Sequence, residues 1–144
     1  MEALVGDAGV DAVKDQLLSG SCLCQEVTFT VKDADKNIWY CHCRQCRRVT
    51  GHYLAATRCE DNNLQIKGTV KWYYRKPNIR YGFCPKCGSQ LFWKDDQSPL
   101  ISILAGSFSN TSFFQEKGHI YLAEKGAYYD LCDNLPKYHR DKKG

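Results

Sequence analysis

The chain has 144 residues and a formal net charge of +4, from 20 Lys and Arg against 16 Asp and Glu. This length suits one domain with its own core, and the 43% hydrophobic and 25% charged residues exclude a disordered chain and, since no apolar run is long enough, a membrane span. Nine residues are Cys, an odd number that disfavours a framework of disulfides alone.

Residues 1–19 are expected to form an arm before the folded domain. Apolar residues recur in this segment at the spacing of a helix, namely Val10, Val13, Leu17 and Leu18. This spacing predicts a short helix that ends at Ser19 and Gly20. Acidic residues interrupt the segment, so it does not resemble a secretory signal. We expect a cytoplasmic or nuclear chain, where thiols stay reduced and bind metal.

From Cys22 onward the pattern changes to the two-residue period of β-strands. Val27, Phe29 and Val31 alternate with polar residues. Further short strand candidates follow at residues 38–41, 53–57, 64–67, 70–75, 80–83, 91–93, 101–105 and 119–123. Many short strands joined by turns favour antiparallel pairing. We predict an all-β domain over residues 20–138, followed by a basic tail at residues 139–144.

The longest predicted connection, residues 105–118, contains three Phe. A long loop with apolar side chains either covers a functional site or fills a gap in the core. The sequence leaves both alternatives open.

Seven of the nine Cys occur in groups with the spacing of metal ligands: Cys22 and Cys24; Cys41, Cys43 and Cys46; Cys84 and Cys87. Alternate residues of a strand face the same side, so Cys-x-Cys can offer two sulfurs to one ion, and a turn does the same for Cys-x-x-Cys. Gly88 follows the last pair and suits the positive φ of a zinc knuckle. Cys59 and Cys132 have no partner at this spacing and are predicted to be buried thiols.

Seven thiolates cannot fill two four-thiolate zinc sites, so one of two zinc ions is expected to keep an open position, as catalytic zinc does. Spacing alone allows Cys43 and Cys46 to share an ion with Cys84 and Cys87. Closeness in the sequence instead favours Cys41, Cys43 and Cys46 as the open site. The closed structural site would then consist of Cys22, Cys24, Cys84 and Cys87.

His42 and His52 allow two interpretations. Either one completes the second zinc site, so that both ions are structural, or it transfers protons, because imidazole titrates near pH 7. Three basic residues, Arg44, Arg47 and Arg48, surround the same Cys residues. Their guanidinium groups either bind the carboxylates of a substrate or balance the charge of the thiolates.

Several segments together resemble the glutathione-dependent formaldehyde-activating enzymes, also called the centromere-protein-V domain family. They are residues 20–24 (GSCLC), 41–48 (CHCRQCRR), 83–88 (FCPKCG) and the closing stretch 119–136. The resemblance covers about residues 20–138. It implies a β-tent of small antiparallel sheets, a structural zinc at Cys22, Cys24, Cys84 and Cys87, and an active-site zinc at Cys41, Cys43 and Cys46.

The activity implied by this resemblance is the condensation of glutathione with formaldehyde to S-(hydroxymethyl)glutathione, a carbon–sulfur lyase reaction in reverse. We therefore expect a zinc-dependent lyase that acts on a small thiol such as glutathione and an aldehyde. The expected catalytic residues are Cys41, Cys43, Cys46 and His42, and the expected substrate-binding residues are Arg44, Arg47 and Arg48.

The alternative is a non-catalytic, zinc-stabilised module that binds a protein or a nucleic acid. Basic residues alternate with Trp72, Tyr73 and Tyr74, as on a stacking platform. However, two zinc ions and seven thiolates would reduce the net charge to about +1, which disfavours a nucleic-acid partner.

Overall fold

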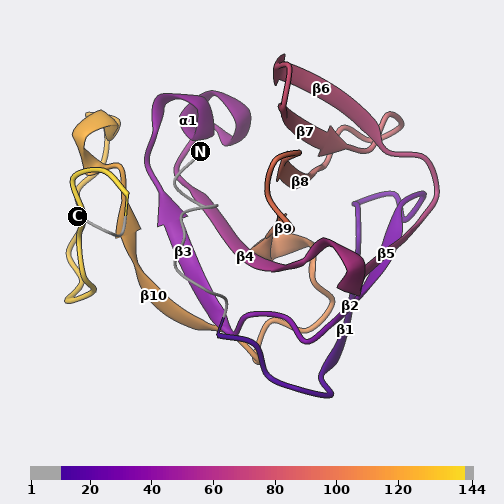
Figure 1. The fold of residues 1–144 in the computed structure, drawn as a ribbon. Coiled ribbons are helices and arrows are strands. Elements are labelled where there is room, and N and C mark those ends of the chain that lie inside the picture. The colour runs from indigo at the N-terminus through magenta and orange to yellow at the C-terminus, as the bar shows by residue number, and fades with distance from the viewer. Residues whose placement is uncertain (1–10, 142–144) are drawn as a thin grey trace.

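The computed structural model describes residues 11–141, which fold mainly into β-strands (Figure 1). One sheet has three strands in the order β1-β2-β5, and the other has seven in the order β10-β3-β4-β9-β8-β7-β6. The all-β prediction is confirmed, and the arrangement agrees with the β-tent that the resemblance implied. The first ten residues of the expected arm and residues 142–144 of the expected tail lie outside the described part.

The strands are β1 (Leu17–Ser21), β2 (Thr28–Lys32), β3 (Asn37–Cys41), β4 (Leu54–Glu60), β5 (Leu64–Lys67), β6 (Lys71–Lys76), β7 (Ile79–Phe83), β8 (Gln90–Asp95), β9 (Leu100–Leu104) and β10 (Gln115–Ile120). The α-helix in the described part is α1 (Arg44–Thr50), and 3₁₀ turns occur at Asp61–Asn63, Ala105–Ser107 and Leu122–Glu124.

The predicted N-terminal helix is wrong for the described part of its segment. Leu17–Ser21 is instead strand β1, antiparallel to β2, with Leu18 opposite Val31. Leu17 is 70% exposed whereas Leu18 packs against the core, so neighbouring residues face opposite sides as in a strand. Val10, the first residue of the expected helix, lies outside the described residues.

One strand pair departs from the antiparallel pattern. β10 runs parallel to β3, and the two lie side by side in Figure 1. His119 is opposite Tyr40, and Ile120 is opposite Cys41. The chain between these strands forms β4 to β9, and this is the long connection that a parallel pair requires. The pairing places His119 beside the cysteine-rich segment that follows β3.

The connection at residues 105–118 contributes Phe108 to the core. Phe108 is 4% exposed and meets the rings of Phe29 and Phe114 edge-on, with centroids 5.4 and 4.8 Å away. Such aromatic pairs stabilise a core beyond the area they bury. Gly106 and Ser107 of the same connection line a cavity, so the structure has features of both alternatives that the sequence left open.

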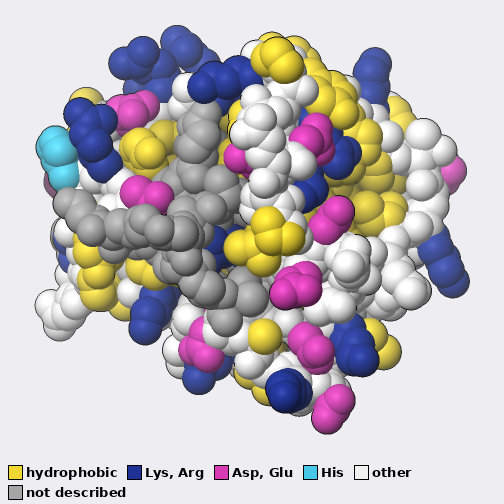
Figure 2. Space-filling model, viewed as in Figure 1, with side chains coloured by type: hydrophobic (Ala, Val, Ile, Leu, Met, Phe, Trp, Pro, Cys, Tyr) yellow, Lys and Arg dark blue, Asp and Glu magenta, His cyan; other side chains and the backbone are white. Residues whose placement is uncertain are grey.

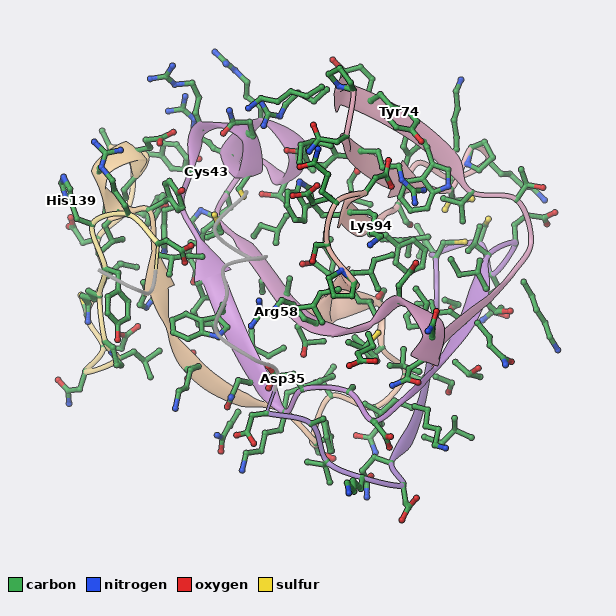
Figure 3. The ribbon with its side chains drawn as sticks, in the orientation of Figure 1. Asp35, Cys43, Arg58, Tyr74, Lys94 and His139 are labelled. Atoms are coloured by element: carbon green, nitrogen blue, oxygen red, sulfur yellow. The ribbon has the colours of Figure 1, made fainter. Side chains whose placement is uncertain are left out.

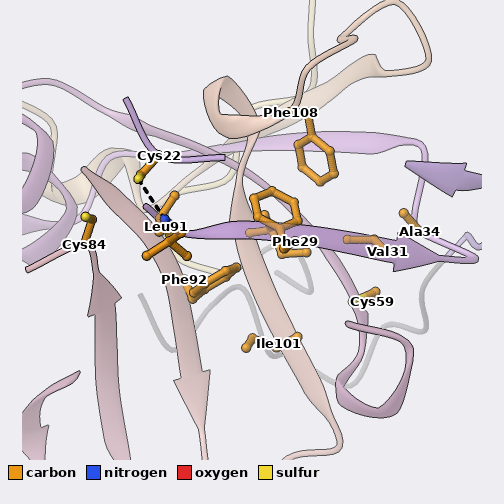
Figure 4. Packing of buried hydrophobic residues seen from close by; sticks show 12 residues of the cluster. Cys22, Phe29, Val31, Ala34, Cys59, Cys84, Leu91, Phe92, Ile101 and Phe108 are labelled. Carbon is orange, nitrogen blue, oxygen red and sulfur yellow. Dashed lines mark hydrogen bonds between the residues drawn. The ribbon is translucent and has the colours of Figure 1, made fainter. Parts of the chain in front are cut away.

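Two clusters of buried side chains form the core, and each contains Cys residues from one of the proposed zinc sites. One cluster includes Cys41, Cys43 and Cys46 with Trp93 and Leu54. The other includes Cys22 and Cys84 with Phe29, Leu91 and Phe92, as seen in Figure 4. A metal ion bound by either group of Cys residues would therefore lie next to the packed side chains of one core cluster.

Candidate metal centres

Cys22, Cys24, Cys84 and Cys87 converge although they come from two distant parts of the chain. Their sulfurs lie within 4.8 Å of one another, and we call them the four-thiol group. The sulfur of Cys24 lies 3.7 Å from that of Cys22 and 3.8 Å from that of Cys84. The group joins the turn after β1 to the turn after β7, as a structural zinc site does when it cross-links a small domain.

The two turns of the four-thiol group are shaped by backbone hydrogen bonds. Gly88 has φ 79° and donates its N–H to the carbonyl of Cys84, as expected for a knuckle. The amides of Lys86 and Cys87 point at the sulfur of Cys84, each 3.4 Å away. In the other turn, Val27 donates to the sulfur of Cys22 at 3.3 Å. Such amide donors stabilise a thiolate before any metal binds.

Cys41, Cys43 and Cys46 form the second cluster, which we call the three-thiol group. Their sulfurs also lie within 4.8 Å of one another, and each residue is at most 1% exposed. Cys41 ends β3, and Cys43 is the N-cap of α1, whose start it marks in Figure 3. The Cys43 sulfur accepts a hydrogen bond from the amide of Cys46 at 3.3 Å. Cys43 thus occupies the position that Ser or Asp usually takes.

Without a metal ion, only one of the three buried thiols readily becomes a thiolate. Hydrogen bonds from Cys41 and Cys46 hold the pKa of Cys43 far below its usual value. The hydrogen bond with Cys43 raises the pKa of Cys41 to about 12, and burial raises the pKa of Cys46 beyond that of an ordinary thiol. Three thiolates can coexist here only beside a cation, and Zn²⁺ prefers this soft donor set. The residues present therefore fit zinc.

The grouping expected from closeness in the sequence is the grouping that the structure has. Among the described residues, the three-thiol group includes no carboxylate and no His nitrogen within the same radius. Both nitrogens of His42 have other partners, and His52 is exposed. Among the described residues, neither His42 nor His52 places a nitrogen in the three-thiol group.

His42 instead belongs to a buried hydrogen-bonded series. Its Nδ1 lies 2.5 Å from the hydroxyl of Tyr129, and its Nε2 lies 2.9 Å from Nδ1 of His119. Nε2 of His119 lies 2.8 Å from Oδ2 of Asp133. Burial lowers the pKa of His42 to about 4, helped by nearby His119 and Lys125. Hydrogen bonds from His119 and Lys137 lower the pKa of Asp133 to about 2, so this carboxylate is ionised at neutral pH.

His119, Tyr129 and Asp133 were not assigned any role from the sequence. They lie in the closing stretch that supported the family resemblance, but no spacing links them to His42. The link depends on the parallel pairing of β10 with β3, in which the amide of His42 donates to the carbonyl of Ile120. The closing stretch contains polar residues, but their spacing in the sequence does not show that they are hydrogen-bond partners of His42.

The three arginines occupy different surroundings. Arg44 is exposed, and its amide donates to the carboxylate of Glu124 at 2.9 Å. Arg47 is half-buried. Arg48 lines a cavity of about 460 Å³ together with Arg75, Tyr73 and Tyr81. Two guanidinium groups beside aromatic rings suit a ligand that has a carboxylate. Of the three expected substrate-binding residues, Arg48 thus has the most suitable position.

A larger cavity of about 550 Å³ lies between the turn after β1 and helix α1. Cys22 lines it on one side, and Val49, Thr50 and Tyr53, from α1 and the segment before β4, line it on the other. Val49 also lines the cavity of Arg48, so the two hollows adjoin. Volumes of this size accommodate small molecules. Neither cavity is lined by a residue of the three-thiol group, whose members are all buried.

The two remaining cysteines differ from each other. Cys59 is fully buried, as predicted. Cys132 is exposed, so its prediction as a buried thiol is wrong. It precedes the exposed Asp133 in a segment without regular secondary structure, where few apolar side chains are available to cover it.

The surface gives limited support to a stacking platform for nucleic acid. Tyr73 and Tyr74 are 60% and 53% exposed, but Trp72 packs on Phe92, and the Arg80 guanidinium lies over the Trp72 ring, 4.1 Å from its centroid. On the face drawn in Figure 2, Lys and Arg side chains stand at the upper edge and also across the lower half, where they are interspersed with Asp and Glu. No described helix has the length and apolar character needed to cross a membrane.

Comparison with known proteins gives a likeness in fold and a match to one family. The structure is similar to the crystal structure of a Rhodobacter sphaeroides protein, with a TM-score of 0.55 and 19% sequence identity over 64% of this chain and 88% of that chain. At this identity the likeness concerns the fold alone. A search of curated proteins gave no match. A family model described as glutathione-dependent formaldehyde-activating enzyme matches residues 17–124. The chain therefore belongs to the glutathione-dependent formaldehyde-activating enzyme family.

Proposed function

We propose that the protein is a zinc-dependent carbon–sulfur lyase of the S-(hydroxymethyl)glutathione synthase type. It joins a small thiol such as glutathione to an aldehyde, or separates the two. The observation that carries this proposal is the three-thiol group, in which three sulfurs converge and the described residues provide no fourth ligand. Membership of the family supports thiol and formaldehyde chemistry in general. Reduced thiols of this kind persist in the cytoplasm, where we place the activity.

The two zinc ions would have different roles, one structural and one catalytic. Cys22, Cys24, Cys84 and Cys87 would hold one in a closed site that stabilises the fold. Cys41, Cys43 and Cys46 would hold the other, which supplies Lewis-acid stabilisation of a sulfur anion when bound. Three thiolates donate much negative charge to the zinc ion and make it a weaker Lewis acid. The site therefore suits the binding of a substrate thiol better than the activation of water.

The surrounding residues would bind the substrate and handle its proton. Arg48 and Arg75 line one cavity, where they would bind a carboxylate of a glutathione-like peptide. The adjoining cavity is lined by Val49 and Thr50 of α1, the helix that also carries Cys46 of the three-thiol group. Its lowered pKa keeps the imidazole of His42 neutral at pH 7, the form that can accept a proton from the substrate.

A non-catalytic binding module is the second candidate. The observation that favours it is the burial of the three sulfurs, each at most 1% exposed, since a substrate must displace neighbouring side chains to reach them. This candidate predicts full zinc occupancy without any effect on small thiols.

The test is an exchange experiment with ¹³C-formaldehyde and glutathione, followed by NMR with zinc-loaded, anaerobically purified protein. We expect the wild type to accelerate formation and breakdown of the adduct, and Cys43→Ser to lose this acceleration. Cys132→Ser is the matched control, because its exposed thiol belongs to neither group, and it should behave as wild type. Exchange that is no faster with wild type than without protein would contradict the proposal and favour the binding module.

A further inference from the structure

The two adjoining cavities beside helix α1 differ in the charge of their linings. The cavity of about 460 Å³ contains the guanidinium groups of Arg48 and Arg75. The described residues that line the cavity of about 550 Å³ include no Lys, Arg, His, Asp or Glu, and we call it the uncharged cavity. Because an anion that leaves water needs a partner of opposite charge, the first cavity suits an anion and the uncharged cavity suits a neutral molecule.

Leucine side chains line the uncharged cavity from its mouth to its interior. They are Leu23, Leu54, Leu91 and Leu104. Leu23 is 85% exposed, which places it at the mouth, whereas Leu54 and Leu91 are fully buried and belong to the inner wall. A hydrocarbon chain gains free energy when such surfaces remove it from water. The lining therefore favours a neutral ligand that has an apolar chain.

The hydroxyl groups of the lining include two that have no hydrogen bond. Thr50 donates to the carbonyl of Cys46 at 2.9 Å, and Ser107 donates to the carbonyl of Leu104 at 2.7 Å. Within the described part of the chain, the hydroxyls of Ser21 and Tyr53 take part in no hydrogen bond. Each can donate to an acceptor on a ligand, and a carbonyl oxygen is such an acceptor.

Tyr53 is the better placed of these two donors for the proposed reaction. Its ring is held between others, with centroids 5.2 Å from that of Tyr40 and 4.7 Å from that of His42, the residue between Cys41 and Cys43. Leu54, the next residue, lines the cavity and belongs to the same core cluster as the three-thiol group. A carbonyl group that accepts from Tyr53 would thus be bound on the side of the cavity that faces this cluster.

We propose that the uncharged cavity binds the carbonyl substrate and that this substrate is an aldehyde with an apolar chain of several carbons. Formaldehyde is much smaller than the cavity and has no chain that could contact its leucines. The Tyr53 hydroxyl donates to the carbonyl oxygen, and the chain lies against the Leu side chains. This inference rests on the proposed function for its reaction and names the substrate class, but binding in the cavity is measurable without any reaction.

The arrangement gives each of the two substrates its own cavity. A thiol with a carboxylate binds beside Arg48 and Arg75, and the neutral aldehyde binds in the uncharged cavity. Val49 and Gln90 line both cavities, so the two substrates are neighbours. A fatty acid of the same length as the aldehyde is excluded from the uncharged cavity, since its carboxylate would lose water there without gaining a cation.

The first test measures the binding of unreactive amides, which have a carbonyl group but do not combine with thiols. Zinc-loaded protein is titrated with acetamide, butanamide and hexanamide and followed by ¹H–¹⁵N NMR. We expect Kd to fall about fourfold with each added methylene, with shifts centred on Leu54, Leu91 and Leu104. Hexanoate should leave these signals in place and shift those of Arg48 and Arg75. Equal affinity for the three amides, or shifts confined to residues outside the lining, would overturn the inference.

Tyr53→Phe tests whether the cavity recognises the carbonyl group. It removes the hydroxyl and keeps the ring packing, so hexanamide should bind about 3- to 10-fold more weakly, the effect of one lost hydrogen bond. Tyr74→Phe is the matched control, because Tyr74 is 53% exposed and lines neither cavity. It should bind hexanamide as wild type does. Wild-type affinity in Tyr53→Phe would show that Tyr53 does not hold the carbonyl group.

Gly106→Leu tests the size of the substrate. Gly106 lines the uncharged cavity, and a Cβ there meets nothing within 4 Å, so a Leu side chain has room to occupy part of the space. We expect the ratio of kcat/KM for hexanal to kcat/KM for formaldehyde, each with glutathione, to fall at least about tenfold. Ala127→Leu adds the same side chain at an exposed residue that lines neither cavity and should keep the wild-type ratio. An unchanged ratio in Gly106→Leu would contradict the inference.

The two proposals fail in different ways. If wild type accelerates the exchange of formaldehyde with glutathione but hexanamide does not bind in the uncharged cavity, the substrate class is wrong and the proposed function stands. If hexanamide binds as expected but neither formaldehyde nor hexanal exchanges faster with the protein, the proposed function is wrong and the cavity remains a binding site for neutral carbonyl compounds.

Discussion

At the scale of single residues, the surroundings of each thiol set its reactivity. Burial raises the pKa of Cys59 to about 12, whereas Cys132 is exposed. Because the thiolate is the reactive form, we expect iodoacetamide to modify Cys132 in folded, zinc-loaded protein and to spare Cys59 until the chain unfolds. Peptide mass spectrometry after timed alkylation measures both rates. Equal rates at the two thiols in folded protein would contradict this account.

Tyr40 provides a pH-dependent contribution to stability. Its hydroxyl donates to the carboxylate of Glu116 at 2.6 Å, and burial followed by this hydrogen bond raises the pKa of Tyr40 above its usual value of 10.0. A raised pKa in the folded state gives stability that is complete below about pH 10 and is lost as the pH rises further. Urea unfolding at several pH values should therefore show a smaller alkaline loss of stability in Tyr40→Phe than in wild type.

Tyr73→Phe is the matched control for this measurement, because it removes an exposed hydroxyl from strand β6. It should follow the wild-type curve at all pH values. Identical alkaline losses in wild type and Tyr40→Phe would show that the hydrogen bond with Glu116 does not contribute as described.

The sequence was informative about residues whose chemistry depends on near neighbours. The Cys spacing identified seven thiols that converge in two groups, and Gly88 was correctly predicted to adopt a positive φ. The partners of His42 depend on contacts between distant segments, and no local pattern records them. Whether a side chain is exposed also depends on distant segments of the chain. For this reason the prediction that Cys132 is buried was incorrect.

At the scale of elements, β1 packs closely against its neighbours because residue 20 is Gly. A Cβ at Gly20 would lie 2.3 Å from the Phe29 ring and 2.4 Å from the carbonyl oxygen of Ser107. Gly20→Ala should therefore separate β1 from the turn at Ala105–Ser107 and lower the free energy of unfolding by about 1–3 kcal/mol. Chemical denaturation of zinc-loaded protein measures this change.

Gly106→Ala is the control for the same turn, since a Cβ at that position meets nothing within 4 Å. We expect its stability to remain close to that of wild type. A Gly20→Ala protein as stable as Gly106→Ala would show that the close approach between β1 and this turn is readily relieved.

Most strands were predictable because their side chains alternate and turn residues separate them. Helix α1 was missed, since its seven residues are too few for a helical period and include a metal-ligand pattern. β1 was misassigned because two adjacent Leu fit a helical spacing as well as a strand. β10 begins earlier than expected, at Gln115, because its pairing with β3 is decided by tertiary contacts.

At the scale of the whole molecule, the two thiol groups lie in different core clusters and share no residue. Loss of a ligand from one group should therefore leave the other group assembled. The four-thiol group ties together two turns from distant parts of the chain, so its metal should contribute more to global stability. The three-thiol group comes from one continuous segment, and its metal is free to serve the chemistry of the site.

The zinc content of anaerobically purified protein tests this division most directly. We expect about two zinc ions per chain in wild type and in Cys132→Ser, and about one in Cys43→Ser with the fold retained, since one group of ligands is broken and the other is not. One zinc ion in wild type, or two in Cys43→Ser, would contradict the account of two separate metal centres.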